Sequence, residues 1–319
     1  MLKTAFKFIF YDKAKSFGAL MGVVISTFLI GQQVGVFTFL TNAMRGLSRF
    51  NTQYIWVIDS QTENANALGK LDARIQRELE SFNGVAKVHP IFIGNGSVQL
   101  PDGQASGATL IGVDASSFAG LPPSFEKGTY TDLLADGAMA VDVFDKQNFQ
   151  TREIGTPFEL NKRKVYIAAL TRGVRGFGAG YIFTTIDRAR MLSNASNSAT
   201  SAFLIETVAG ANKDDVCKLI NKNVFGVQAR KGEEFCDTTM WTVLRTTSIA
   251  TSIGTLVIFA LISGFFIVGL TLYSAAVDRL KDYGTMKAIG ATNGYLARLI
   301  FLQGIIIATT GFGIGYLMV

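Results

Sequence analysis

The chain has 319 residues, of which 49% are hydrophobic and 17% are charged, and its formal net charge is +6. This apolar excess is typical of an integral membrane protein and argues against a disordered chain. The positive charge gathers beside apolar segments, so it gives no support for binding to nucleic acid.

Three long segments carry no charged side chain, at residues 16–44, 246–277 and 299–319. Each can supply the roughly 20 apolar residues with which a helix crosses a bilayer. The sequence therefore predicts three spans, at residues 17–40, 246–277 and 299–319. The first is longer than the apolar core of a signal peptide, so we interpret it as a retained anchor.

The basic residues that flank these spans predict the orientation. They are Lys3, Lys7, Lys13, Lys15, Arg279, Lys281, Lys287 and Arg298. Because Lys and Arg are enriched in short cytoplasmic flanks, we expect residues 1–16, an amphipathic N-terminus, and residues 278–298 to be cytoplasmic. Residues 41–245 then form an extracytoplasmic domain of a multi-pass membrane protein.

The predicted extracytoplasmic domain has a repeated β-α-β pattern. Its first half is a strand at 54–58, a helix at 68–82 and a strand at 85–93. The second half is a strand at 202–208, a helix at 213–223 and a strand at 224–230. Between the halves, residues 94–201 are rich in glycine and short apolar runs, which indicates a β-rich insertion. The fold class is thus a transmembrane helical protein with a large α+β extracytoplasmic domain.

The helical pattern before the second span begins near Glu233. A continuous helix from there to Val277 would measure roughly 65 Å, about twice the hydrocarbon thickness, and would form a stalk outside the membrane. A helix break near Thr246 is the alternative. Both interpretations are open from the sequence.

Few residues outside the membrane suggest chemistry. Cys217 and Cys236 are the only cysteines, and an oxidising compartment would permit a disulfide, although two free thiols are equally compatible with the sequence. The single histidine, His89, stands alone, so we expect no metal site and no catalytic residues. The chain has no phosphate-binding loop of the kind that ATPases carry, so it is not expected to hydrolyse ATP.

The short segment at 278–298 has a regular apolar pattern. Leu280, Tyr283, Met286 and Ile289 recur every three residues, which predicts a short amphipathic helix. Gly290 is suited to ending that helix, and Thr292 or Asn293 to capping the next. From this pattern alone, a docking surface for a cytoplasmic protein and a turn anchored by lipid head groups are both open.

The run Asp278-Arg279-x-x-Asp282-Tyr283-Gly284-x-x-Lys287-Ala288-Ile289-Gly290-Ala291 resembles the cytoplasmic motif of the FtsX-like or MacB-type ABC transporter permeases. Its wording is most similar to the DevC-type branch, except that Asp278 and Asp282 replace the more usual Glu. The plan of one span, a large outer domain and further spans is also similar along the whole chain.

This resemblance implies an exporter permease of a bacterial inner membrane, whose large outer domain is periplasmic. It also implies that the permease forms a homodimer and binds a separate ABC ATPase, on which ATP and Mg²⁺ are bound; no cofactor is expected on this chain. Nucleotide-driven motion would pass through the stalk to the outer domain, a process called mechanotransmission, to export a lipid, glycolipid, lipoprotein or other amphiphile. A periplasmic adaptor, an outer-membrane channel and membrane lipid are further implied partners. The implied ATPase-coupling residues are Asp278, Arg279, Lys281, Asp282, Tyr283, Gly284, Lys287, Gly290 and Ala291.

Two alternatives accompany this reading. Some relatives regulate cell-wall hydrolases and transport nothing, and a large domain between two spans is also the layout of membrane-anchored sensors. The family has a fourth span, which the sequence up to Val319 does not show.

Overall fold

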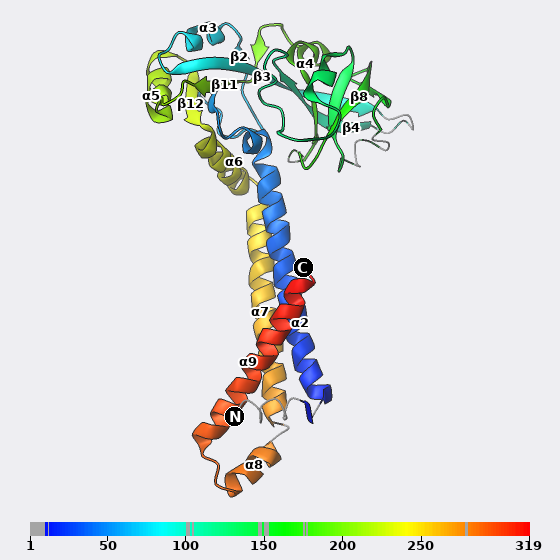
Figure 1. Cartoon of the computed structure of the whole chain (residues 1–319), viewed down its shortest axis with the longest axis vertical. Helices are drawn as coiled ribbons and strands as arrows, with labels where there is room; N and C mark the ends of the chain where they lie inside the picture. The colour runs from blue at the N-terminus through cyan, green and yellow to red at the C-terminus, as the bar shows by residue number, and fades with distance from the viewer. Residues whose placement is uncertain are drawn as a thin grey trace. The chain divides into compact units, whose positions relative to one another are not determined.

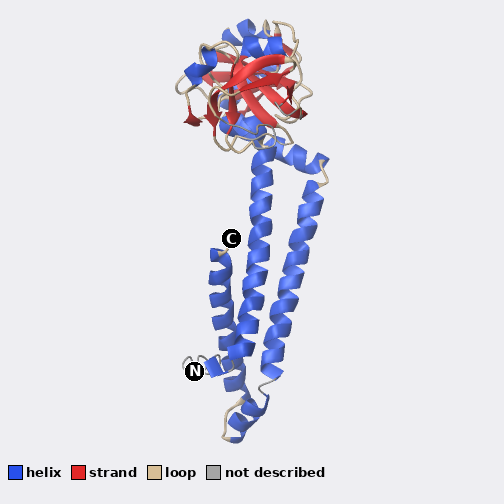
Figure 2. Ribbon diagram, turned by 90° about the vertical axis from the view of Figure 1, so that its right-hand side faces the viewer, coloured by secondary structure: helices blue, strands red, loops and turns tan. Residues whose placement is uncertain are grey.

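The structure is a computed structural model that describes residues 10–11, 13–99, 103, 105–145, 149, 153–174, 176, 178–277 and 280–319. The chain divides into two compact units, one comprising residues 1–39 and 248–319 and the other residues 40–247. All described strands belong to the second unit, and the described part of the first unit is helical (Figure 2). Most of the predicted N-terminal amphipathic segment lies outside the described residues.

In its described residues, the first unit contains long apolar helices and a short helix (Figure 1). They are α2 (Lys13–Met44), α7 (Ile249–Val277), α8 (Leu280–Ala288) and α9 (Asn293–Leu317). By length and apolar composition, two described segments qualify as membrane spans, Ser16–Met44 and Asn293–Leu317. A third qualifies if Gly232–Thr246 and Thr251–Ile267 are counted as one broken span, so the number of three spans stays a prediction.

Glycines allow α9 to pack closely on α2. The buried residues of α9 recur every four positions, at Leu299, Gln303, Ile307, Gly311 and Gly315. Cβ atoms added at Gly311 and Gly315 would come within 2.7 Å of the Cβ atoms of Val23 and Thr27, respectively. Small residues spaced by four let helix backbones approach in the membrane, where packing rather than water exclusion drives association. The two helices therefore run in parallel, in close contact.

The helix α7 uses a different face of α2. Its Gly264 is buried, and an added Cβ would lie 3.3 Å from the Cβ of Ser26. Ser26 is itself buried and donates a hydrogen bond to the Gly22 carbonyl, so its hydroxyl is satisfied within α2. Most other large side chains of α7, such as Phe259 and Phe265, are exposed, as expected for a helix that faces lipid or another chain.

The second unit is an α+β domain built on one mixed sheet. The strands follow the order β12-β1-β11-β3-β4-β9-β6-β8-β5, with β7 paired to both β3 and β8. The strands are β1 (Ile55–Asp59), β3 (Val85–Gln99), β4 (Ala105–Val113), β5 (Phe125–Lys127), β6 (Ala138–Asp142), β7 (Pro157–Leu160), β8 (Arg163–Thr171), β9 (Gly180–Thr185), β11 (Ala202–Thr207) and β12 (Val227–Lys231). A two-stranded sheet adds β2 (Leu71–Asp72) and β10 (Ala199–Thr200).

The two predicted β-α-β halves interleave as β12-β1-β11-β3, which confirms this part of the fold class. Alternate residues of β1 face opposite sides of the sheet, as strand geometry requires. Ile55 and Val57 pack with α3 (Ile75–Glu80) and α5 (Lys213–Asn223), whereas Trp56 and Ile58 pack on the other face. The predicted helix at 68–82 is wrong in length, because Leu71 pairs in β2 and only the six residues of α3 are helical.

The β-rich insertion closes into a six-stranded barrel, formed by β3, β4, β9, β6, β8 and β7 in a ring. Its interior is filled by apolar side chains such as Met139, Phe158 and Ile182. The helix α4 (Ile186–Leu192) adds Ile186, Ala189 and Leu192 to this core. The strand β3 is longer than predicted because it pairs with β11 up to Ile91 and with β4 from Ile91 to Gln99, so it belongs to both lobes.

The remaining helices are η1 (Gly46–Phe50), η2 (Tyr130–Leu134) and α6 (Gly232–Thr246). The helix α6 ends because Thr247 adopts an extended backbone, with φ −105° and ψ 145°, and α7 starts at Ile249. A break near Thr246 is therefore observed, and the alternative of one continuous helix from Glu233 to Val277 is wrong. The interruption divides the predicted stalk between the two units.

Candidate functional site

The short helix α8 carries the residues that the sequence motif singled out. Lys281, Asp282, Tyr283, Gly284 and Lys287 lie on this helix. Gly290 and Ala291 form the turn that follows it. Asp278 and Arg279, the other two predicted residues, lie outside the described residues. The structure thus gathers the described part of the predicted site in a segment of twelve residues, Leu280 to Ala291.

The turn at the end of α8 is fixed by backbone hydrogen bonds. Gly290 has a φ of +104°, a value that glycine adopts with little strain. The Gly290 amide donates to the Lys287 carbonyl at 3.0 Å, and the Ala291 amide donates to the Met286 carbonyl at 3.0 Å. These two bonds form a Schellman motif, which satisfies carbonyls that a helix end otherwise leaves open. The predicted left-handed stop at Gly290 is confirmed.

The helix α9 begins two residues later with a capped first turn. The Thr292 hydroxyl accepts a hydrogen bond from the Tyr295 amide at 3.3 Å, so Thr292 is the N-cap. A defined stop and a defined start leave little freedom in the linker between α8 and α9. The helices α8 and α9 are therefore joined by a short, hydrogen-bonded turn.

Most of α8 is exposed. Tyr283 is buried and Met286 is half-buried, whereas Leu280 and Ile289 are 63% and 82% exposed. The predicted apolar stripe is thus covered only at its centre. Lys281 and Lys287 are exposed and give the described helix a positive surface beside the single carboxylate of Asp282. Such a surface can dock an acidic partner.

A second group of contacts lies in the α+β domain, where α6 meets the end of α2 and η1. Arg45 is the residue that follows the end of α2, and its Nη2 donates a hydrogen bond to Asp237 Oδ1 at 3.0 Å. The Thr239 hydroxyl accepts the Ala65 amide at 3.0 Å. The Asn66 side chain donates to the Met44 carbonyl at 2.6 Å. We call these contacts the α6 junction.

The cysteines do not form the disulfide that the sequence left open. Both are free and buried. Cys217 belongs to α5, which packs on the Ile55 face of the sheet, whereas Cys236 belongs to α6, whose Phe235 packs on Trp56 on the opposite face. The sheet separates the two helices. Burial raises the pKa of Cys217 to about 11 and also raises the pKa of Cys236, so both thiols are protonated at neutral pH.

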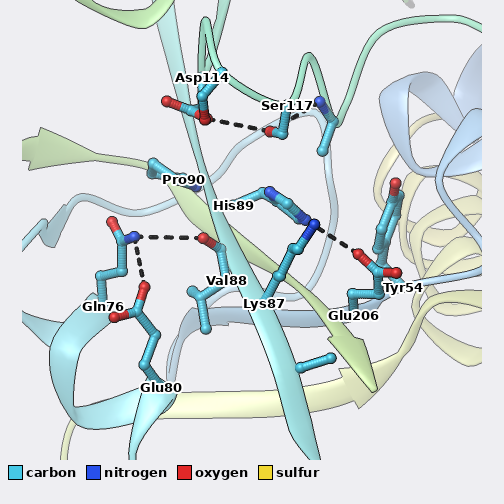
Figure 3. Close-up of a pocket in the computed structure, with 13 residues that line it drawn as sticks. Tyr54, Gln76, Glu80, Lys87, Val88, His89, Pro90, Asp114, Ser117 and Glu206 are labelled. Atoms are coloured by element: carbon cyan, nitrogen blue, oxygen red, sulfur yellow. Dashed lines mark hydrogen bonds and ion pairs between the residues drawn. The ribbon is translucent and has the colours of Figure 1, made fainter. Parts of the chain in front are cut away.

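A cavity of about 560 Å³ lies beside β3 and α3 (Figure 3). His89 is buried in its wall, with Nε2 3.6 Å from Glu206 Oε2. The Gln76 amide donates to Glu80 at 2.8 Å and to the Val88 carbonyl at 3.4 Å, and Ser117 donates to Asp114 at 3.2 Å. Each carboxylate of the wall therefore already has a partner, and we assign no ligand to this cavity.

A second cavity, of about 520 Å³, lies between α4 and the start of β8. Its Arg188 Nη1 donates to the carbonyls of Leu133 and Ala138 and to the Thr184 hydroxyl, at 2.9 to 3.0 Å. Burial lowers the pKa of Arg188, and nearby Asp136 opposes this shift. These bonds give Arg188 a structural role. Among the described residues, no three His, Cys, Asp or Glu side chains form a metal-binding group.

The family comparison concerns the C-terminal part of the chain. Residues 254–319 match the family model described as FtsX-like permease C-terminal. The C-terminal part is an FtsX-like permease domain. This domain includes most of α7, together with α8 and α9. The resemblance that the sequence motif indicated is thereby confirmed, and with the apolar helices it indicates an inner-membrane protein.

Solved structures give two further similarities. One is the extracellular domain of the noncanonic ABC-type transporter YknZ from Gram-positive bacteria, with 12% identity and a TM-score of 0.40, covering 56% of this chain and 98% of that one. The other is the periplasmic region of MacB from Actinobacillus actinomycetemcomitans, with 12% identity and a TM-score of 0.44, covering 59% and 93%. No curated protein matches the chain. The family assignment therefore depends on the permease-domain match.

The α6 junction has no counterpart in the sequence prediction. Arg45 and Asp237 are 192 positions apart, and neither belongs to a motif. Gly46, next to Arg45, has a φ of +55°, and an added Cβ would lie 2.8 Å from the Tyr181 hydroxyl. This glycine, six residues after the predicted span at 17–40, was a local signal of a tight turn there.

Proposed function

We propose that this chain is the membrane subunit of an ABC-type exporter and that a separate ATPase acts on it through residues 278–291. The ATPase would bind ATP and Mg²⁺, and this chain would provide no catalytic residue. The observation that carries the proposal is α8. It is a short exposed helix between two apolar helices, closed by the Gly290 turn, within the matched permease domain.

The covalent order of the helices supports a mechanical role. The helix α8 is separated by two residues from the end of α7, and α7 begins three residues after the end of α6. The helix α7 has 29 residues and therefore measures about 43 Å. Because a helix resists bending, α7 can carry a displacement along its length. The helix α6 belongs to the α+β domain, and the ion pair of its Asp237 with Arg45 connects α6 to the end of α2.

We infer further that the exported substrate is an amphiphile such as a lipid, glycolipid or lipoprotein. Charged residues such as Lys87, Glu206, Arg163 and Arg188 line the two described cavities of the α+β domain, so neither is a purely apolar pocket. The exposed aromatic residues of α7, among them Phe259, Phe266 and Tyr273, provide an apolar surface for lipid or for a second copy of this chain. A homodimer, a periplasmic adaptor and an outer-membrane channel belong to the same proposal.

Co-purification tests the coupling site. The full chain is expressed with a candidate ABC ATPase, as the wild type and as the double variant Lys281→Glu and Lys287→Glu. The ATPase should co-purify with the wild type and be lost from the double variant, because both lysines are exposed on α8. The control is Lys222→Glu, which reverses an exposed charge at the end of α5 in the other unit and should leave ATPase binding unchanged.

The result separates the alternatives. If the double variant retains the ATPase, α8 is not the coupling site. If the ATPase binds and hydrolyses ATP but no labelled amphiphile leaves membrane vesicles, a regulator that transports nothing is favoured. If no ATPase binds the wild type, the sensor becomes the better explanation.

A further inference from the structure

The helix α6 has two distinct sides. Phe235, Thr239 and Val243 are buried against the rest of the α+β domain. The opposite side carries Trp241, whose side chain is 55% exposed, and Arg245, which is also exposed. Tryptophan combines a large apolar ring with a polar N–H, so it is suited to a boundary between an apolar layer and water.

Two connections keep α6 close to helices that span the membrane. At its middle, Asp237 forms an ion pair with Arg45, and Arg45 follows Met44, the last residue of the span-forming segment Ser16–Met44. At its end, α6 stops at Thr246, three residues before α7 begins. From Trp241 to Thr246 the chain makes five helical steps of about 1.5 Å each, and from Thr246 to Ile249 it makes three steps of at most about 3.6 Å each. Trp241 therefore lies at most about 18 Å from Ile249.

The order of side chains along the exposed side suits a bilayer surface. Glu233, Glu234 and Asp237 come first, then Trp241, and Arg245 is the residue nearest to α7. Tryptophan concentrates at the level of lipid head groups, where one part of the ring is apolar and the N–H is hydrated. Arginine donates strong hydrogen bonds to phosphate oxygens, whereas carboxylates are repelled by them.

We propose that the exposed side of α6, through Trp241 and Arg245, binds the phospholipid head-group layer on the side of the membrane where the α+β domain lies. The indole would insert among the head groups and the guanidinium would bind lipid phosphate. This contact would fix the height of α6 above the bilayer, and it does not depend on the ATPase or on transport.

Tryptophan fluorescence tests the contact directly. The chain has two tryptophans, and the other, Trp56, is fully buried and donates its indole N–H to the Asn51 carbonyl at 3.0 Å. The full chain is reconstituted into nanodiscs of phosphatidylcholine or of phosphatidylcholine brominated near the head-group end of its acyl chains. Bromine should remove the Trp241 share of the emission in the wild type and leave the emission of Trp241→Phe unchanged.

Two more variants test the role of the charge. Arg245→Ala should reduce quenching in the wild-type background, because the phosphate contact is lost. Glu234→Gln, at the far end of the same side, should quench like the wild type. The proposal is overturned if brominated lipid quenches the wild type no more than Trp241→Phe, which is the result expected when water or a second copy of the chain covers Trp241. Equal thermal melting of all variants shows that they are folded.

Discussion

The close contact between α2 and α9 makes a quantitative prediction about three glycines of one helix. A Cβ at Gly311 would lie 2.7 Å from the Val23 Cβ, and one at Gly315 would lie 2.7 Å from the Thr27 Cβ. Carbon atoms prefer about 3.5–4.0 Å, so alanine at either position must push the helices about 1 Å apart. At Gly313, on the same helix, an added Cβ meets nothing within 4 Å.

The expected energies follow from these distances. Overpacking a close contact costs about 1–3 kcal/mol, whereas replacing glycine by alanine inside a helix returns about 0.8–1 kcal/mol. Gly313→Ala receives only the second contribution. Gly311→Ala and Gly315→Ala should therefore be less stable than Gly313→Ala by about 1–3 kcal/mol.

Reversible unfolding in mixed detergent micelles measures this difference, with the helix content followed by circular dichroism. Gly313→Ala is the matched control, because it changes the same residue type on the same helix. If all three variants unfold at the same detergent fraction, α2 and α9 are not in close contact at these glycines, and the packing argument is wrong.

Three other predictions concern the turn, the α6 junction and the thiols. Gly290→Ala should weaken ATPase co-purification more than Gly294→Ala does. Of these two glycines only Gly290 has a positive φ, of +104°, and this conformation costs an L-residue about 1–2 kcal/mol. Asp237→Ala should lower the thermal stability by less than about 1 kcal/mol, and less still in high salt, because its ion pair with Arg45 is partly exposed; a large loss measured by calorimetry would contradict this. In the folded protein, Cys217 and Cys236 should react slowly with maleimide at neutral pH, because both are buried and burial favours the protonated form of Cys217. After the chain is unfolded in the absence of reductant, both thiols should react rapidly. The raised pKa of Cys217 contributes stability below its unfolded value of about 9, and this contribution decreases as the pH rises toward 11. Labelling that requires reductant after unfolding would establish a disulfide instead.

Features that depend on neighbouring residues were predictable. The helix α5 coincides with the predicted 213–223, because the periodic apolar residues Val216 and Ile220 lie between an Asn212 cap and a clear end. The turn at Gly290 also follows from local chemistry, since few residues other than glycine adopt a positive φ without strain. The long apolar segments were equally plain, because a bilayer requires about 20 apolar residues in succession.

Other features were decided by contacts between distant residues. The helix predicted at 68–82 lost its first half because Leu71 pairs with Thr200 in a strand. The helix before the second span ended at Thr246 although its apolar pattern continues into α7. In both places the local helical preference is worth only a few tenths of a kcal/mol per residue, so tertiary contacts override it.

The sequence by itself determined where the long apolar helices lie, which segment joins the last two of them, and that the domain after the first of them is α+β with repeated β-α-β units. The tertiary structure decided that β7 closes the insertion into a barrel, that the sheet separates Cys217 from Cys236, and that Arg45 meets Asp237 beside α6. The physical reason is the separation along the chain of the residues that interact. Periodicity, capping and apolar length act over a few residues, whereas strand pairing and ion pairs join positions that only the folded chain brings together.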